Sequence, residues 1–212
     1  MRVPLRPLAV ACLEACAVVL LGSGCSRSDL GDEVRLAPGS SAPASRRVIA
    51  FGQPIPKGGG IYKVGEPYQI DGEWHIPRED PGYERVGIAS YYAADFHGRH
   101  TANGEIFDMW ALSAAHPTLP LPCLVYVTNV DNGRTLLLRV NDRGPYVNNR
   151  VIDVSRAAAR YLGFESQGTA RVRMRYAGRA PLTGDDRQEQ RFLASQSWFR
   201  VALSREPQYA GR

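Results

Sequence analysis

The segment "LLLRVNDRGPYVNNRVIDVS", residues 136–155, carries the most information about the fold of this chain. It opens with an apolar run typical of a buried strand and then turns over at residues 141–145, NDRGP. Asn, Asp, Gly and Pro are ordinary turn residues, because they supply positive φ, a fixed φ or side-chain bonds to the backbone. A turn alone does not require a carboxylate and an arginine at the end of an apolar strand. Asp142 is therefore either a turn cap or a functional acid.

Length and composition indicate a globular protein. The chain has 212 residues, of which 44% are hydrophobic and 22% charged, enough for one domain with appendages or two small domains. The net charge of +5 is mild, and Lys57 and Lys63 are the lysines of the chain. Nucleic-acid binding usually shows clustered Lys and Arg, so this composition disfavours a nucleic-acid partner.

The amino terminus has the features of a secretion signal. Arg2 and Arg6 precede an apolar run, residues 8–21, that is too short for a comfortable membrane span. The run ends in "LLGSGC", which resembles a bacterial lipobox with Gly22 where Leu is usual. We expect residues 1–24 to be a lipoprotein signal peptide and Cys25 to be lipidated, with a plain secretory signal as the alternative. Because Ser26 is not the Asp that retains such proteins in the inner membrane, we expect an anchor in the outer membrane, facing the periplasm.

Cysteine usage predicts no disulfide in the mature domain. Cys12 and Cys16 leave with the signal peptide and Cys25 carries lipid, so Cys123 remains without a partner. Cys123 lies in an apolar stretch and is expected to be a small buried core residue.

The rest of the chain divides into four parts. Residues 25–58 are rich in Ser, Gly, Pro and Ala and are expected to form a flexible tether. Residues 59–85 contain Asp71-Gly72, a hairpin signal, and are expected to form a β-hairpin extension. Residues 86–177 are the predicted barrel domain. Residues 178–212 are a polar tail with one amphipathic helical candidate, 187–203, that could dock on the barrel.

The barrel region is read as an all-β domain with one short helix. Its β-rich runs, bounded by turn residues, are 86–93, 110–116, 123–129, 134–141 and 170–176. The run "RVRMR" alternates strictly, which places Val172 and Met174 on one face and the arginines on the other. The segment "SRAAARYLG" predicts a helix with Ser155 as N-cap and Gly163 as its stop. Many short strands with one helix indicate a small closed barrel.

Three segments together resemble a known family. They are "ASYYAADFHGRHTANGEIFD" (89–108), "ALSAAHPTLPLP" (111–122) and "VNDRGPYVNNRVIDVS" (140–155). The chain resembles, over residues 60–177, the rare lipoprotein A (RlpA) family of septal lytic transglycosylases, which implies a six-stranded double-psi β-barrel. Many members also carry a C-terminal SPOR domain, which we do not expect in residues 178–212.

The resemblance also implies a site. Two carboxylates are essential in the family, and they correspond here to Glu105 in "TANGE" and Asp142 in "VNDRGP". The implied reaction is cleavage of the β-1,4 bond between N-acetylmuramic acid and N-acetylglucosamine, with a 1,6-anhydro end on the muramic acid and a preference for peptide-free glycan strands. From the residues alone, Asp142 could equally cap its turn, and Glu105 could be a solvated turn residue.

Six further residues are candidates for binding the glycan. An outward tyrosine could stack on a sugar ring, and polar groups of the three segments could hold acetamido or lactyl groups. The candidates are Tyr92, His97, Thr101, Asn103, His116 and Arg143. Asp153 is expected to be structural, bonding to backbone at the start of the helix. No His/Cys/Asp set has metal-ligand spacing and no phosphate-binding or dinucleotide motif is present, so neither a metal nor another cofactor is expected.

Three functions remain open from the sequence. The first is the lytic transglycosylase, whose partners are glycan strands, the membrane through Cys25 and cell-division proteins. The second is a non-catalytic peptidoglycan-binding or divisome-associated lipoprotein on the same barrel. The third is a hydrolase that would release reducing ends. The presence of both Glu105 and Asp142 favours the enzyme.

Overall fold

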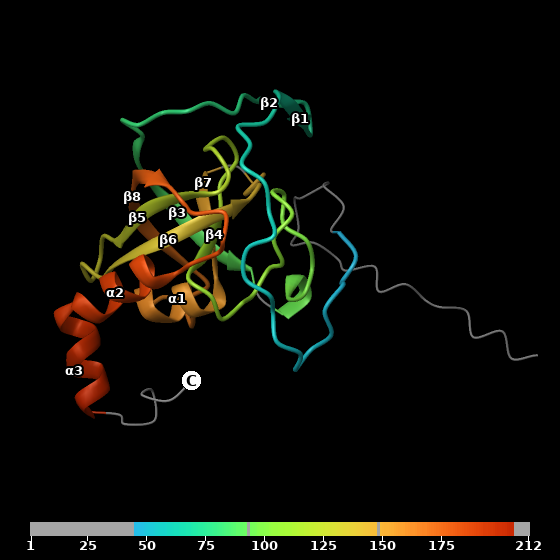
Figure 1. Cartoon of the computed structure of the whole chain (residues 1–212). Helices are drawn as coiled ribbons and strands as arrows, with labels where there is room; N and C mark the ends of the chain where they lie inside the picture. Colours follow the sequence, from blue (N-terminus) through green and yellow to red (C-terminus); the bar gives the residue numbers. More distant parts are fainter. Residues whose placement is uncertain (1–44, 93, 148, 206–212) are drawn as a thin grey trace, which may run out of the picture. The chain divides into compact units, whose positions relative to one another are not determined.

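The computed structural model describes residues 45–92, 94–147 and 149–205 (Figure 1). The predicted signal peptide, the lipidation site Cys25 and the first part of the predicted tether lie outside these residues. Within the described ranges, none of the helices combines the length and the apolar content needed to cross a membrane.

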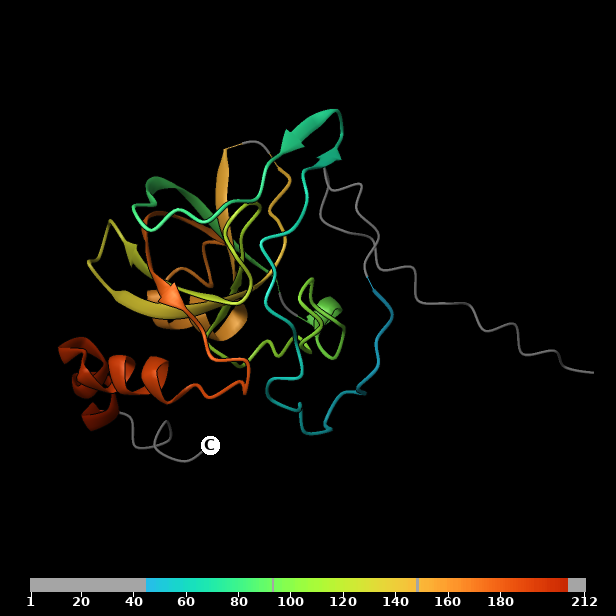
Figure 2. The ribbon, with the colours of Figure 1, turned by 45° about the horizontal axis from the view of Figure 1, so that its top comes forward.

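Six strands wrap around a common interior and close a barrel (Figures 1 and 2). The strands are β3 (Glu84–Tyr92), β4 (Ser113–Ala115), β5 (Cys123–Asn129), β6 (Thr135–Asp142), β7 (Arg150–Ser155) and β8 (Thr169–Arg179). Their order around the barrel is β3-β7-β4-β6-β5-β8. The pairs β3–β7 and β4–β6 are parallel and the other four are antiparallel. The predicted all-β barrel class is therefore confirmed.

The barrel interior is filled by the apolar residues that alternate along its strands. Val172 and Met174 on β8 are fully buried, whereas Arg171, Arg173 and Arg175 face solvent, as the alternation predicts. Cys123 on β5 is also fully buried, which confirms its place in the core. Each large apolar side chain removed from water in this way contributes about 1.5–3 kcal/mol to folding.

Two strands differ from the sequence prediction. β7 was not among the predicted runs, although Ile152 and Val154 are fully buried. β4 spans only 113–115 instead of 110–116, because the chain turns just before it with Ser113 N–H bonded to the Ala111 carbonyl. Each of the two strands has one parallel neighbour, β3 for β7 and β6 for β4, and all three residues of β4 are buried, so β4 shows no polar alternation.

The helix α1 (Arg156–Leu162) follows β7 directly and has the predicted ends. Ser155 Oγ accepts a hydrogen bond from Ala158 N–H at 3.2 Å, and Gly163 ends the helix with φ of 81°. Asp153 has structural contacts, as predicted, but the predicted bond to backbone at the helix start is wrong. Its carboxylate accepts a hydrogen bond from Ser90 Oγ at 2.6 Å and lies 3.3 Å from the Arg150 guanidinium, on β3 and β7 rather than at the helix start.

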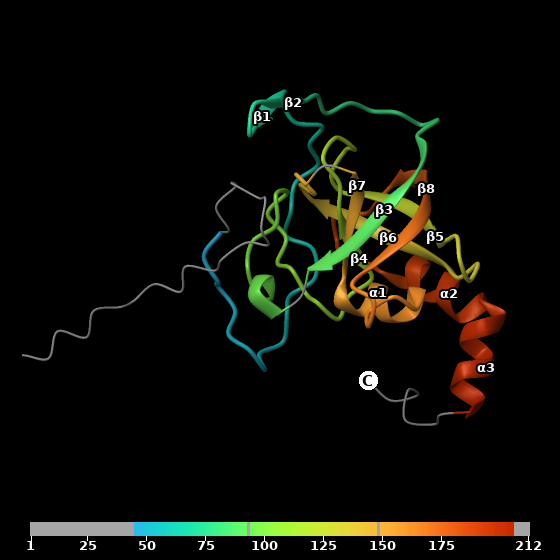
Figure 3. The ribbon, with the colours of Figure 1, turned by 180° about the vertical axis from the view of Figure 1, so that it is seen from behind.

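Strands β1 (Tyr68–Ile70) and β2 (Glu73–His75) form the predicted hairpin. Asp71 and Gly72 both have positive φ, 50° and 85°, which suits a tight hairpin turn. The hairpin lies beyond one end of the barrel (Figures 1 and 3), and the Tyr68 hydroxyl donates to the Pro117 carbonyl at 2.7 Å. The β element therefore docks on the main domain as expected.

The tail forms two helices, α2 (Arg187–Ser195) and α3 (Ser197–Arg205), where one helix over 187–203 was predicted. The break falls at Gln196, whose ψ of 128° is extended. α2 packs against β6, with Leu193 buried and Phe192 5.1 Å from the ring of Tyr126. Docking of the amphipathic segment on the barrel is confirmed.

Residues 45–65, called the N-terminal strap below, run along the loops of the barrel. Val48 N–H donates to the Gly98 carbonyl at 2.8 Å, Ile61 N–H to Asn103 at 2.9 Å and Lys63 N–H to Leu121 at 2.7 Å. The described part of the predicted tether, residues 45–58, thus contacts the folded domain. A short 3-10 helix, η1 (Ala94–Phe96), lies in the loop that the strap follows.

Candidate active site

Asp142 is the last residue of β6, at the point where the strand leaves the barrel. Its Oδ1 accepts two backbone hydrogen bonds of 2.8 Å, from Ala102 N–H and Arg143 N–H. No described residue donates to Oδ2, and the side chain is partly exposed. Burial raises the pKa of Asp142 to about 6, although the two backbone bonds and the charges of Arg143 and Lys63 act in the opposite direction. Asp142 can therefore hold a proton near neutral pH and present it to a ligand.

Glu105 has the opposite environment. It is buried, and Arg139 approaches it with two groups, Nε at 2.9 Å from Oε2 and Nη2 at 2.5 Å from Oε1. Asn103 Nδ2 donates to Oε1 at 3.0 Å and Asn141 Nδ2 to Oε2 at 2.9 Å. Burial alone would raise the pKa of Glu105, but the bonds from Arg139 and Asn141 and the charge of Arg139 outweigh it and lower the pKa. Glu105 is therefore a fixed anion with both oxygens occupied.

The turn 101–105 connects the two carboxylates. Thr101 Oγ1 donates to Asn103 Oδ1 at 2.9 Å, and Asn103 Oδ1 also accepts from Glu105 N–H at 3.3 Å. Asn103 N–H in turn bonds to the Asn141 carbonyl at 3.3 Å. These bonds hold the turn in the shape that aims Ala102 N–H at Asp142. Thr101 and Asn103, expected to bind glycan, thus make their contacts within the site's own framework.

The two candidate histidines also make internal bonds. His116 is fully buried, and its Nδ1 accepts from Thr118 N–H at 3.1 Å and Leu119 N–H at 2.9 Å. Its Nε2 lies 2.8 Å from the Tyr83 hydroxyl, and burial lowers its pKa to about 3, so the ring is neutral. His97 is buried as well, and its Nδ1 accepts from Met109 N–H at 3.3 Å. His116 therefore supports the loop after β4, and His97 supports the backbone at Met109.

Arg143 and Tyr92 complete the residues expected to bind glycan. The Arg143 guanidinium donates to three carbonyls, of His116 at 3.2 Å, Leu119 at 2.5 Å and Val64 at 2.5 Å, and so ties the strap to the loop after β4. The ring of Tyr92 stacks on Phe107 with 4.2 Å between centroids, and the residue is partly exposed. Burial raises the pKa of Tyr92, and the charge of Asp142 adds to this, which places the phenol near the acid.

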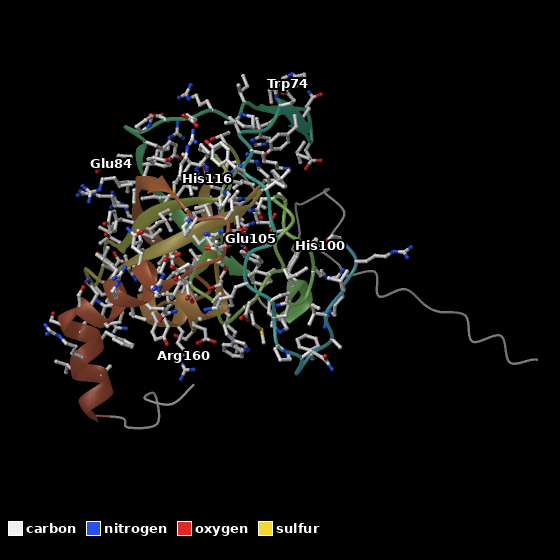
Figure 4. The ribbon with its side chains drawn as sticks, in the orientation of Figure 1. Trp74, Glu84, His100, Glu105, His116 and Arg160 are labelled. Atoms are coloured by element: carbon white, nitrogen blue, oxygen red, sulfur yellow. The ribbon has the colours of Figure 1, made fainter. Side chains whose placement is uncertain are left out.

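Several residues of the site were missed by the sequence reasoning. Arg139 and Asn141 are the partners of Glu105, and they share one face of β6 because they are two residues apart. That alternation was the available signal. The tail was also missed as a part of the site, although Arg139 Nη2 donates to the Pro181 carbonyl at 2.9 Å. Figure 4 shows Glu105 in the middle of the molecule, whereas Trp74 lies at the tip of the hairpin.

The domain is a small barrel whose site contains one protonatable carboxyl and one ion-paired carboxylate. Proteins of similar sequence are consistent with this description. Residues 84–174 match the family model described as "Lytic transglycolase". The chain is 49% identical over 122 residues to "Endolytic peptidoglycan transglycosylase RlpA" of Pseudomonas aeruginosa (strain UCBPP-PA14), covering 57% of this chain and 35% of that protein. It is 49% identical over 120 residues to the protein of the same name from Rickettsia bellii, covering 55% and 53%.

A third relative of that name, from Helicobacter pylori (strain J99), is 50% identical over 109 residues, covering 51% of this chain and 35% of the relative. The chain thus spans between about a third and a half of the length of these relatives. Over the matched region, which contains the site, the chain is thus similar to the RlpA-like lytic transglycosylases.

Proposed function

We propose that this protein is a lytic transglycosylase that cleaves the β-1,4 bond between N-acetylmuramic acid and N-acetylglucosamine in peptidoglycan. The observation that carries the proposal is the contrast between two carboxyl groups held by one turn. Asp142 is partly exposed with a pKa of about 6, whereas Glu105 is buried in an ion pair with Arg139. Environments that push two pKa values apart are how a protein assigns an acid and an anion.

In the proposed reaction Asp142 acts twice. It first gives its proton to the glycosidic oxygen while the bond from that oxygen to C1 of muramic acid breaks. The ionised Asp142 then takes the proton of the C6 hydroxyl as O6 of the same sugar bonds to C1, which closes the 1,6-anhydro ring. No water is consumed, and Asp142 ends protonated as it began. General acid catalysis of this kind is worth about 10² to 10⁴ in rate.

Glu105 has a supporting part in this proposal. Its oxygens accept bonds from Arg139, Asn103 and Asn141, so it offers no free oxygen to activate a water molecule. An inverting hydrolase requires a second carboxylate that does so. Glu105 acts instead by fixing the turn that donates Ala102 N–H to Asp142.

Asp142→Asn tests the function, because it keeps the side-chain volume and the accepting oxygen but removes the transferable proton. Incubation of the wild-type protein with purified peptide-free glycan strands is expected to give muramic ends lighter by one water than reducing ends, seen by mass spectrometry. Asp142→Asn should lower this cleavage by at least about a hundredfold while it retains the thermal midpoint. Reducing ends would show a hydrolase, and glycan binding without any cleavage would show the non-catalytic barrel.

We further propose that the protein acts as a lipoprotein of the outer membrane, facing the periplasm and anchored through Cys25, with cell-division proteins as further partners. The support is the "LLGSGC" sequence and Ser26 after it. Several acyl chains give stable anchoring where a single chain is marginal. Cys25→Ala should move the protein out of the outer-membrane fraction, and firm retention there would refute the anchor.

A further inference from the structure

The described residues contain one buried carboxyl that the proposed reaction does not use. Glu189 lies on α2, fifteen residues beyond the end of the matched family model at residue 174, and is 1% exposed. No other described residue donates a hydrogen bond to Oε1 or Oε2. A buried carboxyl without partners costs folding free energy, so its presence needs an explanation.

Glu189 lines a cavity of about 80 Å³ between α2, β6 and the strap. Three other buried groups on this cavity also lack a partner among the described residues: Arg139 Nη1, Asn141 Oδ1 and Ser113 Oγ. Arg139 and Glu189 therefore line the same cavity, and each has polar atoms without a partner among the described residues.

Two close contacts between the strap and the tail border the cavity and hold α2 in place. Lys57 Nζ on the strap lies 2.8 Å from Asp186 Oδ1, which immediately precedes α2. Gly58 and Gly184 meet so closely that a Cβ on Gly184 would lie 2.1 Å from Gly58 N. The N-terminal strap and the tail are therefore in direct contact at the cavity that Glu105 also lines.

We propose that Glu189 is a positioning residue, which holds the Arg139 guanidinium from its free edge and so keeps the opposite edge paired with Glu105. Glu105 takes Nε and Nη2 of Arg139, and Glu189 acts on Nη1 through the cavity. Burial and nearby aspartates raise the pKa of Glu189, whereas its own backbone N–H and, after it, the charge of Arg139 act in the opposite direction. Arg139 is then shared by two carboxyl groups, one from the barrel and one from the tail.

Other charges also face this cavity. They are Lys57, Glu105, Asp108, Arg139 and Asp186. Arg139 is the cation buried among them, because Lys57 is 65% exposed in its pair with Asp186. Arg139 is therefore the group through which Glu189 acts on the site.

The test is a thermal-unfolding cycle at pH 7 on the purified chain. Glu189→Gln keeps the shape but removes the buried carboxyl, and in the wild-type background it should leave the midpoint unchanged or raise it by a few degrees, about 2–4 °C. In a Glu105→Gln background Arg139 has only Glu189 as a carboxyl partner. There Glu189→Gln should lower the midpoint by about 2–4 °C or more, a reversal of sign.

Equal effects in the two backgrounds, within about 1 °C, would overturn the proposal, because independent sites add. If Glu105→Gln does not fold, the Glu105→Gln/Arg139→Met pair provides the second background. Both buried charges are then absent, and Glu189→Gln should raise the midpoint more than in the wild type. Glu165→Gln is the matched control, since it makes the same change in a partly exposed pair with Arg156 and should give the same shift in every background.

A second experiment measures glycan cleavage by Glu189→Gln, and it rests on the proposed function. Glu189→Gln should lower kcat for glycan cleavage by about tenfold, with KM little changed, because a slightly misplaced catalytic group costs rate rather than binding. A variant that is as stable as the wild type but slower separates positioning from a purely structural role, which would lower the midpoint. If the wild-type protein cleaves no glycan, the proposed function fails, whereas the unfolding cycle still decides the part played by Glu189. Full activity in Glu189→Gln, with the wild type active, would refute the positioning role.

Discussion

Removal of Arg139 should produce the largest single loss of stability at the site. Arg139 and Glu105 are 8% and 6% exposed, so Arg139→Leu leaves a carboxylate buried without its cation. Breaking a buried pair in this way typically costs about 3–5 kcal/mol. For a protein of this size each kcal/mol shifts the midpoint by about 2–4 °C, so the expected loss at pH 7 is about 6–20 °C.

The pH dependence of the stability is a second, independent test of the Arg139–Glu105 ion pair. In the wild type Arg139 lowers the pKa of Glu105, so the pair stabilises the fold above about pH 4 and this contribution is lost as the pH falls. In Arg139→Leu burial should raise the pKa of Glu105 instead, and protonation on acidification relieves the penalty. The difference between wild type and variant should therefore shrink between pH 7 and about pH 4.5.

Thermal unfolding followed by circular dichroism at several pH values measures both effects. Arg156→Leu is the control, because its pair with Glu165 is 42% and 27% exposed and should be worth less than about 1 kcal/mol. A loss in Arg139→Leu no larger than in this control would refute the assignment of Glu105 as a buried, ion-paired anion. A large loss of equal size at pH 4.5 and pH 7 would refute its electrostatic origin.

Two further outcomes are expected. Glycan cleavage should fall about tenfold per pH unit above about pH 6, where Asp142 loses its proton, and a rate that rises through pH 8 would exclude Asp142 as the acid. Gly60→Ala should lower the midpoint and slow cleavage, since a Cβ there would lie 2.7 Å from Asn103 Nδ2 and 2.8 Å from Glu105 Cγ. Gly59→Ala is an informative comparison: its Cβ meets nothing within 4 Å, so any loss there reports the strain of its φ of 81° alone.

Features that depend on neighbouring residues were predictable from the sequence. The alternation of Val172 and Met174, the turn at Asp71 and Gly72, and the cap at Ser155 all follow from local periodicity or turn chemistry, and the structure has each of them. β7 was missed because it is short and lies directly between a turn and a helix, although the buried Ile152 and Val154 do alternate along it.

Features that depend on contacts between distant segments were not predictable. The sequence singled out Glu105, but its partner Arg139 is 34 residues away and was not among the predicted site residues. His116 was ranked as a ligand for glycan, and the structure shows it bonded to Thr118, Leu119 and Tyr83. The sequence does contain a signal for the burial of Glu189. It lies four residues before the buried Leu193, and therefore on the inner face of the same helix.

The difference between the two carboxyl groups follows from the alternation of side chains along β6, which places Arg139 and Asn141 on one face and Asp142 on the other. Arg139 and Asn141 point to the face where strap and tail enclose Glu105, and Asp142 turns to the Ala102 N–H in the neighbouring turn. One face is closed around an ion pair and the other leaves an oxygen accessible, so alternation along a single strand separates the buried anion from the proton donor.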